Sequence, residues 1–179
     1  MKILKNKLKS EFNIRTEKDF PKEGIEFIDI MPLIIQKDVF TEIIEDFSEE
    51  VNSLNVDYIV GPEARGLILG AAVANSLKIG FVPVRKAGKL PPTTVAKKFE
   101  YEKEYGRDML ELPKLVKEDY EGKAFYIIDD IYATGNTMKA IENAILELGG
   151  IVKGKGVIMN IKELNNENDI YSLVDINET

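Results

Sequence analysis

The sequence predicts an α/β fold built on a mostly parallel, twisted sheet that helices flank on both faces. Short apolar segments typical of buried strands occur at residues 58–60, 81–84, 125–128 and 156–161. Apolar residues repeat with the helical period at residues 39–51, 66–76 and 137–148. Because these strands and helices alternate along the chain, right-handed crossovers should place the strands parallel and cover both faces of the sheet.

Three parts of the chain lie outside this rhythm. Apolar residues recur every four positions over the first dozen residues, which predicts an amphipathic helix there. The interval at about 86–120 is polar, carries two adjacent prolines and has a later turn signal at Tyr105-Gly106, so we expect a long flexible flap (hood) or hairpin over a site rather than a core element. Residues 165–168, Asn-Asn-Glu-Asn, predict a surface loop. With 179 residues and 44% apolar content, the chain is expected to form a single domain, residues 1–179.

The composition removes several classes of chemistry. There is no cysteine and no histidine, which excludes disulfides, thiolate nucleophiles, histidine general bases and zinc sites of the usual ligand set. A net charge of -7 disfavours nucleic-acid binding through a broad basic surface, whereas a local basic patch suits a phosphorylated small molecule. No apolar stretch is long enough to cross a bilayer and the N-terminus lacks a secretory pattern, so we expect a cytoplasmic protein without a membrane partner.

The most informative stretch follows the strand at 125–128, where Asp129 and Asp130 lead into a small-residue turn, 133–137, that opens a helix. Ligands bind at this end of the strands in open α/β sheets. The backbone N–H groups of the turn suit a phosphate at a helix N-terminus, and the carboxylates suit sugar hydroxyls. The simpler alternative is a solvated acidic pair with a threonine of the turn capping the helix. Two adjacent carboxylates would then repel each other without a role, so we favour a phosphorylated ribose as the ligand.

This stretch resembles the phosphoribosyl-pyrophosphate (PRPP) motif of type I phosphoribosyltransferases, because the strand, the acidic pair and the Ala-Thr-Gly-x-Thr turn occur in that order. The resemblance implies the type I phosphoribosyltransferase fold. It also implies that the ribose and 5′-phosphate of PRPP are bound by Asp129, Asp130, Ala133, Thr134, Gly135, Asn136 and Thr137. Asn136 replaces a second glycine that is common in this family, and asparagine tolerates a left-handed backbone well.

A second strand–turn–helix unit has residues 61–66, Gly-Pro-Glu-Ala-Arg-Gly, as its loop. A Walker A loop is excluded because the required lysine and hydroxyl residue are absent after the last glycine. The simpler alternative is an ordinary turn with a solvated Arg65. However, Arg85, Lys86 and Lys89 follow the next strand, and their charges can converge with Arg65 on a pyrophosphate.

Residues 63–66 and 81–91 are similar to the pyrophosphate loop and flexible hood of the adenine phosphoribosyltransferase family. The resemblance implies pyrophosphate binding by Glu63, Ala64, Arg65, Gly66, Arg85, Lys86 and Lys89. It also implies a Mg2+ ion held mainly through PRPP, between the pyrophosphate and the ribose hydroxyls, without dedicated protein ligands. The hood is slightly longer than is usual in this family, and Lys97 and Lys98 within it are interpreted as an exposed charge run.

Residues 21–32 are similar to the adenine-binding signature of the same family, in which an aromatic ring stacks on the purine. By this resemblance Phe27 is the stacking ring, backbone groups of Glu26 and Ile28 read the amino edge of the base, and Tyr105 belongs to the base site. The simpler alternative makes Phe27 an ordinary core residue. Ile28 stands where the family usually has arginine, so any role of that arginine side chain is lost here.

Residues 101–106 resemble the family's Tyr-x-x-Glu-Tyr-Gly segment, whose glutamate approaches the imidazole edge of the purine. Glu104 is therefore the candidate catalytic residue. A carboxylate enclosed in a dry site can hold or relay the purine proton in a chain without histidine. Glu102 lies two residues away, faces the opposite side of a strand and is interpreted as solvated.

The likeness spans nearly the whole chain. It implies a homodimeric glycosyltransferase of purine salvage that converts adenine and PRPP to AMP and pyrophosphate. Two alternatives stay open: a xanthine- or hypoxanthine-using relative, which shares the PRPP motif, and a non-catalytic PRPP-sensing regulatory module, which would need a nucleic-acid-binding element. A mononucleotide-binding domain of the flavodoxin type is a third alternative, which the paired carboxylates disfavour.

Overall fold

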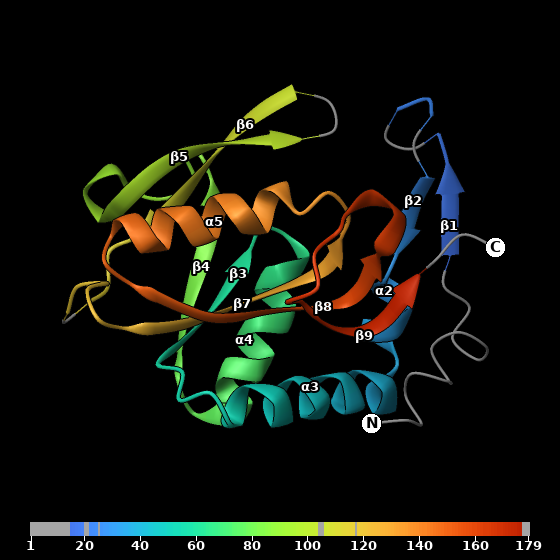
Figure 1. Ribbon diagram of the computed structural model, residues 1–179, viewed down its shortest axis with the longest axis horizontal. Helices are drawn as coiled ribbons and strands as arrows, with labels where there is room; N and C mark the ends of the chain where they lie inside the picture. Colours follow the sequence, from blue (N-terminus) through green and yellow to red (C-terminus); the bar gives the residue numbers. More distant parts are fainter. Residues whose placement is uncertain (1–14, 20–21, 25, 104–105, 117, 177–179) are drawn as a thin grey trace.

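The computed structural model describes residues 15–19, 22–24, 26–103, 106–116 and 118–176. Their centre is a seven-stranded sheet in the order β5-β6-β4-β3-β7-β8-β9 (Figure 1). Its strands are β3 (Tyr58–Pro62), β4 (Gly80–Lys86), β5 (Val95–Lys103), β6 (Gly106–Pro113), β7 (Ala124–Tyr132), β8 (Ile151–Ile161) and β9 (Tyr171–Ile176). Strand β6 runs antiparallel to both neighbours and every other adjacent pair is parallel. The prediction of a mostly parallel α/β sheet is confirmed.

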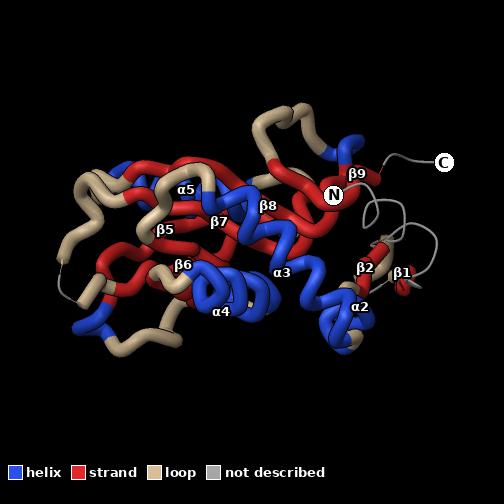
Figure 2. The backbone as a smooth tube through the Cα atoms, turned by 90° about the horizontal axis from the view of Figure 1, so that it is seen from below, coloured by secondary structure: helices blue, strands red, loops and turns tan. Residues whose placement is uncertain are grey.

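Helices cover both faces of this sheet. They are α2 (Met31–Ile35), α3 (Lys37–Asn52), α4 (Arg65–Leu77) and α5 (Asn136–Glu147). In Figure 2, α5 lies on one face of the sheet, and α3 and α4 lie on the other. Successive residues of β7 therefore enter different cores: Tyr126 and Ile128 pack with α3 and α4, whereas Phe125 and Ile127 pack with α5. Burial on both faces explains why the strand is a continuous apolar run rather than an alternating one. None of the described helices is long and apolar enough to span a membrane.

The polar interval at 86–120 forms a β5–β6 hairpin after a short 3-10 helix, η1 (Pro92–Thr94). The hairpin extends the edge of the sheet beyond β4 (Figure 1). The hairpin is not only a flap, because Tyr101, Leu110 and Leu112 are buried in the core on the α5 side. The buried apolar residues alternate with charged residues along each strand, so the sequence shows no continuous apolar run that would predict a core strand here.

The N-terminal region contributes a separate two-stranded antiparallel sheet, β1 (Arg15–Lys18) and β2 (Glu26–Asp29), in which Arg15 lies opposite Asp29. The helix expected over the first dozen residues lies outside the described residues. A second short 3-10 helix, η2 (Lys162–Leu164), follows β8. The β1–β2 sheet stands beside the carboxyl ends of β8 and β9 in Figure 1.

Candidate active site

The candidate site is built on the carboxyl ends of β3 and β7, which are adjacent parallel strands. Helix α4 begins three residues after β3, and α5 begins four residues after β7. The start of α4 lies close against the ends of both strands at Gly66, where an added Cβ would lie 2.5 Å from Cδ of Pro62 and 3.0 Å from Oδ1 of Asp129. Only a residue without a side chain allows this approach, so Gly66 brings the first turn of α4 against β7.

The acidic pair lies inside a strand. Strand β7 continues to Tyr132, four residues beyond the end predicted from the apolar run, so Asp129 and Asp130 are strand residues rather than the residues after it. The backbone N–H of Asp130 donates to Oδ1 of Asp129 at 2.9 Å. Asp130 is only 5% exposed. Removal from water, together with the neighbouring Asp130 carboxylate, raises the pKa of Asp129 well above its ordinary range.

The turn after β7 opens α5 without a side-chain cap. Gly135 is the N-cap residue and has a φ of +79°, and among the described residues no side-chain cap hydrogen bond reaches the start of the helix. The alternative in which Thr134 or Thr137 caps the helix is therefore wrong. Asn136 is the first helical residue, so the left-handed conformation falls on Gly135 and Asn136 does not need it. Within the described part of the chain, the N-cap supplies no side-chain acceptor to the first-turn N–H groups of α5, and this arrangement suits an anion.

Arg65 joins three segments that are far apart in the sequence. Its Nε lies 2.6 Å from Oδ2 of Asp130. Its guanidinium carbon lies 5.0 Å from the centre of the Phe27 ring, which is within the range of a cation–π contact. Phe27 is half-buried and is not a member of either apolar core cluster. The readings of Arg65 as a freely solvated side chain and of Phe27 as ordinary core are both wrong for the described structure.

Glu63 organises the neighbouring cations. Its Oε2 accepts from Nε of Arg85 at 2.9 Å and from the backbone N–H of Lys86 at 3.1 Å. These two hydrogen bonds hold the pKa of Glu63 below its ordinary range. Arg65 and Arg85 thus contact different carboxylates in the described structure, and their convergence on a pyrophosphate stays a prediction. Lys89 is exposed.

The other pyrophosphate-loop residues are divided between surface and interior. Lys86 and Ala64 are exposed, Gly66 is buried, and the peptide bond between Glu63 and Ala64 is cis. In the base-binding segment, Ile28 is half-buried and pairs with Thr16 across the β1–β2 sheet. Glu104 and Tyr105 lie outside the described residues, as does the side chain of Glu26.

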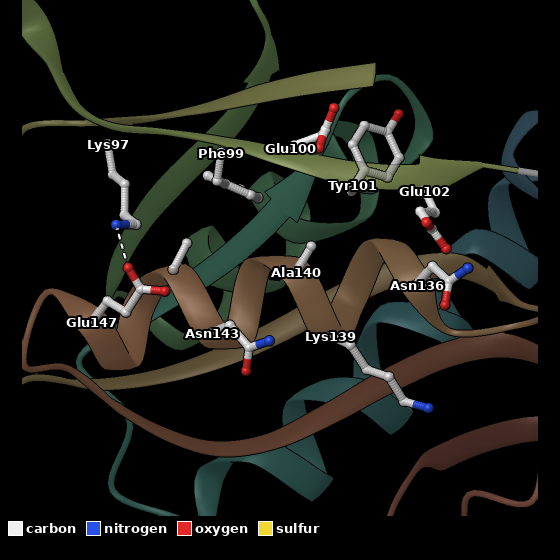
Figure 3. Close-up of a pocket in the computed structure, with 11 residues that line it drawn as sticks. Lys97, Phe99, Glu100, Tyr101, Glu102, Asn136, Lys139, Ala140, Asn143 and Glu147 are labelled. Carbon is white, nitrogen blue, oxygen red and sulfur yellow. Dashed lines mark ion pairs between the residues drawn. The ribbon is translucent and has the colours of Figure 1, made fainter. Parts of the chain in front are cut away.

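The flap packs against α5 across a groove of about 320 Å³ (Figure 3). Nζ of Lys97 lies 2.5 Å from Oε2 of Glu147 at the far end of the helix. Lys97 is half-buried, so the prediction of an exposed charge run holds for Lys98 and is wrong for Lys97. Glu102 is exposed, as predicted, and lies at the end of the groove near Asn136. The groove thus ends at the α5 N-terminus, which places the flap beside the phosphate turn.

Sequence reasoning missed Asn165. Residues 165–168 were expected to form a surface loop, but Asn165 is half-buried and its Nδ2 donates to the Ala133 carbonyl at 2.9 Å. Its place in the sequence could have identified it as a site residue, because Asn165 follows the carboxyl end of β8, the strand that pairs with β7. A polar residue at that end of a neighbouring strand belongs to the same rim as the acidic pair.

Comparison with known proteins agrees with this geometry. The model of the phosphoribosyl transferase domain family matches residues 34–157. The adenine phosphoribosyltransferase of Brachyspira hyodysenteriae is 42% identical over 158 residues, which cover 88% of this chain and 90% of the relative. That of Alkaliphilus metalliredigens is 43% identical over 152 residues, which cover 85% of this chain and 87% of the relative.

Solved structures are similar over almost the full length. The adenine phosphoribosyltransferase of Thermoanaerobacter pseudethanolicus superposes with a TM-score of 0.84 at 38% identity and covers 94% of this chain and 99% of its own. The yeast enzyme was solved in complex with an imino-altritol bisphosphate and adenine. It has a TM-score of 0.83 at 33% identity, and the match covers 97% of this chain and 99% of the yeast chain. The PRPP motif, the matching domain and the close relatives together place this chain in the adenine phosphoribosyltransferase family.

Proposed function

We propose that this chain transfers ribose 5-phosphate from PRPP to adenine and forms AMP and pyrophosphate. The observation that carries the proposal is the meeting of Asp130, Arg65 and Phe27 beside the uncapped start of α5. These groups match the parts of the two substrates: a carboxylate for ribose hydroxyls, a guanidinium for pyrophosphate, an aromatic face for the purine and free N–H groups for the 5′-phosphate. Membership of the family and the adenine in the yeast complex support the same substrates.

Substrate binding exchanges the partners of Arg65. In the free chain its guanidinium neutralises Asp130 and covers the Phe27 ring. When PRPP enters, the ribose hydroxyls take its place at Asp130, and the guanidinium moves to the pyrophosphate. The Phe27 ring then becomes available to stack on the base. A cation on the departing pyrophosphate stabilises the charge that develops there as the bond to the anomeric carbon breaks.

The reaction forms a bond from N9 of adenine to the anomeric carbon as the bond to the pyrophosphate oxygen breaks. The ribose passes through an oxocarbenium-like state, as in glycoside cleavage. Adenine loses its N9 proton, and Glu104 receives or relays that proton. The remaining cations of the pyrophosphate site, Arg85, Lys86 and Lys89, then hold the leaving group after a rearrangement that frees Arg85 from Glu63.

A Mg2+ ion fits this site as a partner of PRPP. Magnesium binds in proteins through one or two carboxylates together with substrate phosphates. Here the ion would be held mainly through PRPP, with Asp129 and Asp130 nearby at the proposed ribose site and not as dedicated ligands, and a nearby dication would favour the ionised form of Asp129, whose pKa is raised. When bound, the ion supplies positive charge to the pyrophosphate.

Adenine is the expected base because its 6-amino group donates and its N1 accepts, whereas hypoxanthine reverses both. Backbone groups around Glu26 and Ile28 that pair with one pattern are left unpaired by the other. A mismatch of buried hydrogen-bonding groups is worth about 10⁴-fold or more in discrimination. Incubation with PRPP, Mg2+ and adenine, hypoxanthine, guanine or xanthine tests this. Comparable turnover of a 6-oxopurine supports the xanthine- or hypoxanthine-using alternative, and PRPP binding without any turnover supports the regulatory module.

The acidic pair is tested separately from the base. The double change Asp129→Asn with Asp130→Asn should weaken PRPP binding and leave the fold intact, because it removes acceptors for ribose hydroxyls. Calorimetry measures the affinity, and Asp169→Asn, an exposed carboxylate on another loop, serves as the control. Unchanged PRPP affinity in a folded double variant would remove the acidic pair from the ribose site.

We further propose a homodimer with the pyrophosphate loop and hood near the partner subunit. Ile68, one turn into α4 after that loop, is 40% exposed and gives this region an apolar residue on its surface. Sedimentation at micromolar protein concentration measures the oligomeric state. A fully active monomer contradicts the proposal.

A further inference from the structure

Asn165 connects the phosphate turn to the neighbouring strand. Its Nδ2 lies 2.9 Å from the Ala133 carbonyl oxygen, 3.0 Å from Oδ1 of Asn160 and 2.9 Å from the Ile161 carbonyl oxygen. Its Oδ1 accepts from the backbone N–H of Glu167 at 3.1 Å. One half-buried side chain therefore bonds to the turn after β7, to β8 and to its own loop.

The other end of this contact is firmly held. Asn160 is fully buried in β8, and its Nδ2 has no hydrogen-bond partner among the described residues. Its amide oxygen accepts from Nδ2 of Asn165, so Asn165 supplies the hydrogen bond that this buried amide makes among the described residues.

The loop around Asn165 also reaches α5. The Glu167 carboxylate lies 3.8 Å from Nζ of Lys139, in the first turns of α5, and the Glu167 carbonyl accepts from Nζ of Lys162 at 3.3 Å. The Lys139–Glu167 pair is partly exposed and contributes little stability. The position of this pair matters more, because it holds the loop at residues 162–167 beside α5 and beside the turn that precedes the helix.

The contact at Ala133 determines how the turn faces its ligand. A trans peptide is planar and its C=O and N–H point in opposite directions. A carbonyl of Ala133 that is held by Asn165 therefore directs the N–H of Thr134 away from Asn165. Two residues later, Gly135 adopts its left-handed conformation and α5 begins, so this peptide is the first one of the turn.

We propose that Asn165 is a positioning residue of the 5′-phosphate site, which fixes the Ala133–Thr134 peptide so that its N–H is aimed at the phosphate. The inference rests on the proposed function, in which the turn 133–137 holds that phosphate. Asn165 itself does not contact the substrate. It reduces the ordering that the turn must undergo on binding, and such preorganisation increases affinity for the group that the turn binds.

Calorimetry on the full folded chain with two probes tests this role. Ribose 5-phosphate reports on the phosphate turn, and Mg-pyrophosphate reports on the loop 63–66. Asn165→Asp has the same shape but cannot donate, so it should weaken ribose 5-phosphate binding by about tenfold, the range of one or two hydrogen bonds, and leave pyrophosphate binding within about twofold. Asn166→Asp places the same added charge on an exposed neighbour in the same loop and should change neither affinity. Asn165→Ala, which adds no charge, replaces Asn165→Asp if that variant does not fold.

Steady-state kinetics adds a second readout. The KM for PRPP should rise in Asn165→Asp by a similar factor, with kcat at saturating PRPP within about twofold of the wild type. Unchanged ribose 5-phosphate affinity overturns the proposal, and so does an equal loss of both probes, which indicates a general structural role. Absence of adenine turnover in the wild type would overturn the proposed function, yet a selective loss of ribose 5-phosphate binding would still support the role of Asn165.

Discussion

The Arg65–Asp130 pair should be asymmetric, so that loss of the arginine costs more stability than loss of the carboxylate charge. The Arg65 side chain is 28% exposed and that of Asp130 is 7% exposed. Arg65→Met keeps most of the stem packing and leaves a nearly buried carboxylate without its cation. Asp130→Asn leaves an arginine that still reaches water and the Phe27 ring. It also removes the carboxylate that, after burial, contributes most to raising the pKa of Asp129.

The magnitudes follow from burial. Breaking a fully buried pair costs about 3–5 kcal/mol, and partial exposure of Arg65 reduces this to about 2 kcal/mol for Arg65→Met. In a chain of this length that corresponds to a Tm about 4–8 °C lower. Asp130→Asn should cost about 1 kcal/mol or less, because the remaining charge is solvated. In the double variant the Asp130 charge is removed together with its cation, so the loss should be about 1–2 kcal/mol smaller than the sum of the single losses.

Urea and thermal unfolding of the ligand-free chain at one protein concentration measure these differences. Arg107→Met is the matched control, because the Arg107 side chain is 65% exposed and its partner Glu100 is 53% exposed. That change should stay within about 0.5 kcal/mol of the wild type. Equal losses at Arg65 and Asp130, or strict additivity in the double variant, would show that the two groups do not depend on each other as the geometry implies.

Three further results are expected. Glu104→Gln, at a position outside the described residues, should lower kcat by about 10²–10⁴-fold with little change in PRPP affinity, and a nearly wild-type rate would move the proton step elsewhere. The raised pKa of Asp129 means that the unfolded chain loses this proton first, near the ordinary value of 3.8. The contribution of Asp129 to the free energy of unfolding should therefore fall as pH rises from about 4 towards its folded pKa, so in urea titrations the wild type should lose stability relative to Asp129→Asn as pH rises. Gly135→Ala should cost about 2–4 kcal/mol from its φ of +79° and a collision with the Tyr132 ring; Gly88→Ala, with the same φ and open space, should show the conformational cost alone.

Much of the fold could be predicted because its signals are local and periodic. The strands at 58–60 and 125–128 are continuous apolar runs, and a strand covered on both faces requires such a run. A flap or hairpin was expected between 86 and 120, but its share in the core was not, because the apolar residues that it buries, such as Leu110 and Leu112, alternate with charged residues. The β1–β2 sheet was not predicted, because four-residue strands have too few positions to show a period.

The candidate site divides in the same way. The order of residues along the chain identified Asp129, Asp130 and the turn that follows, since a strand end, two carboxylates and a helix start are contiguous. Chemistry by histidine and cysteine was excluded by composition alone. By contrast, the partners of Arg65 come from β2 and β7, so its contacts depend on which strands become neighbours.

The sequence by itself determined the class of fold, the family resemblance and the segments that form the rim of the site. Only the tertiary structure decided that Arg65 holds Asp130, that Arg85 holds Glu63 and that Asn165 supports the Ala133 carbonyl. The physical reason is the separation along the chain between the residues that interact. Periodicity and helix-start signals arise within a few residues, whereas a side chain's partner is set by the packing of segments up to about 65 residues apart. Polar groups removed from water must find partners wherever that packing places them.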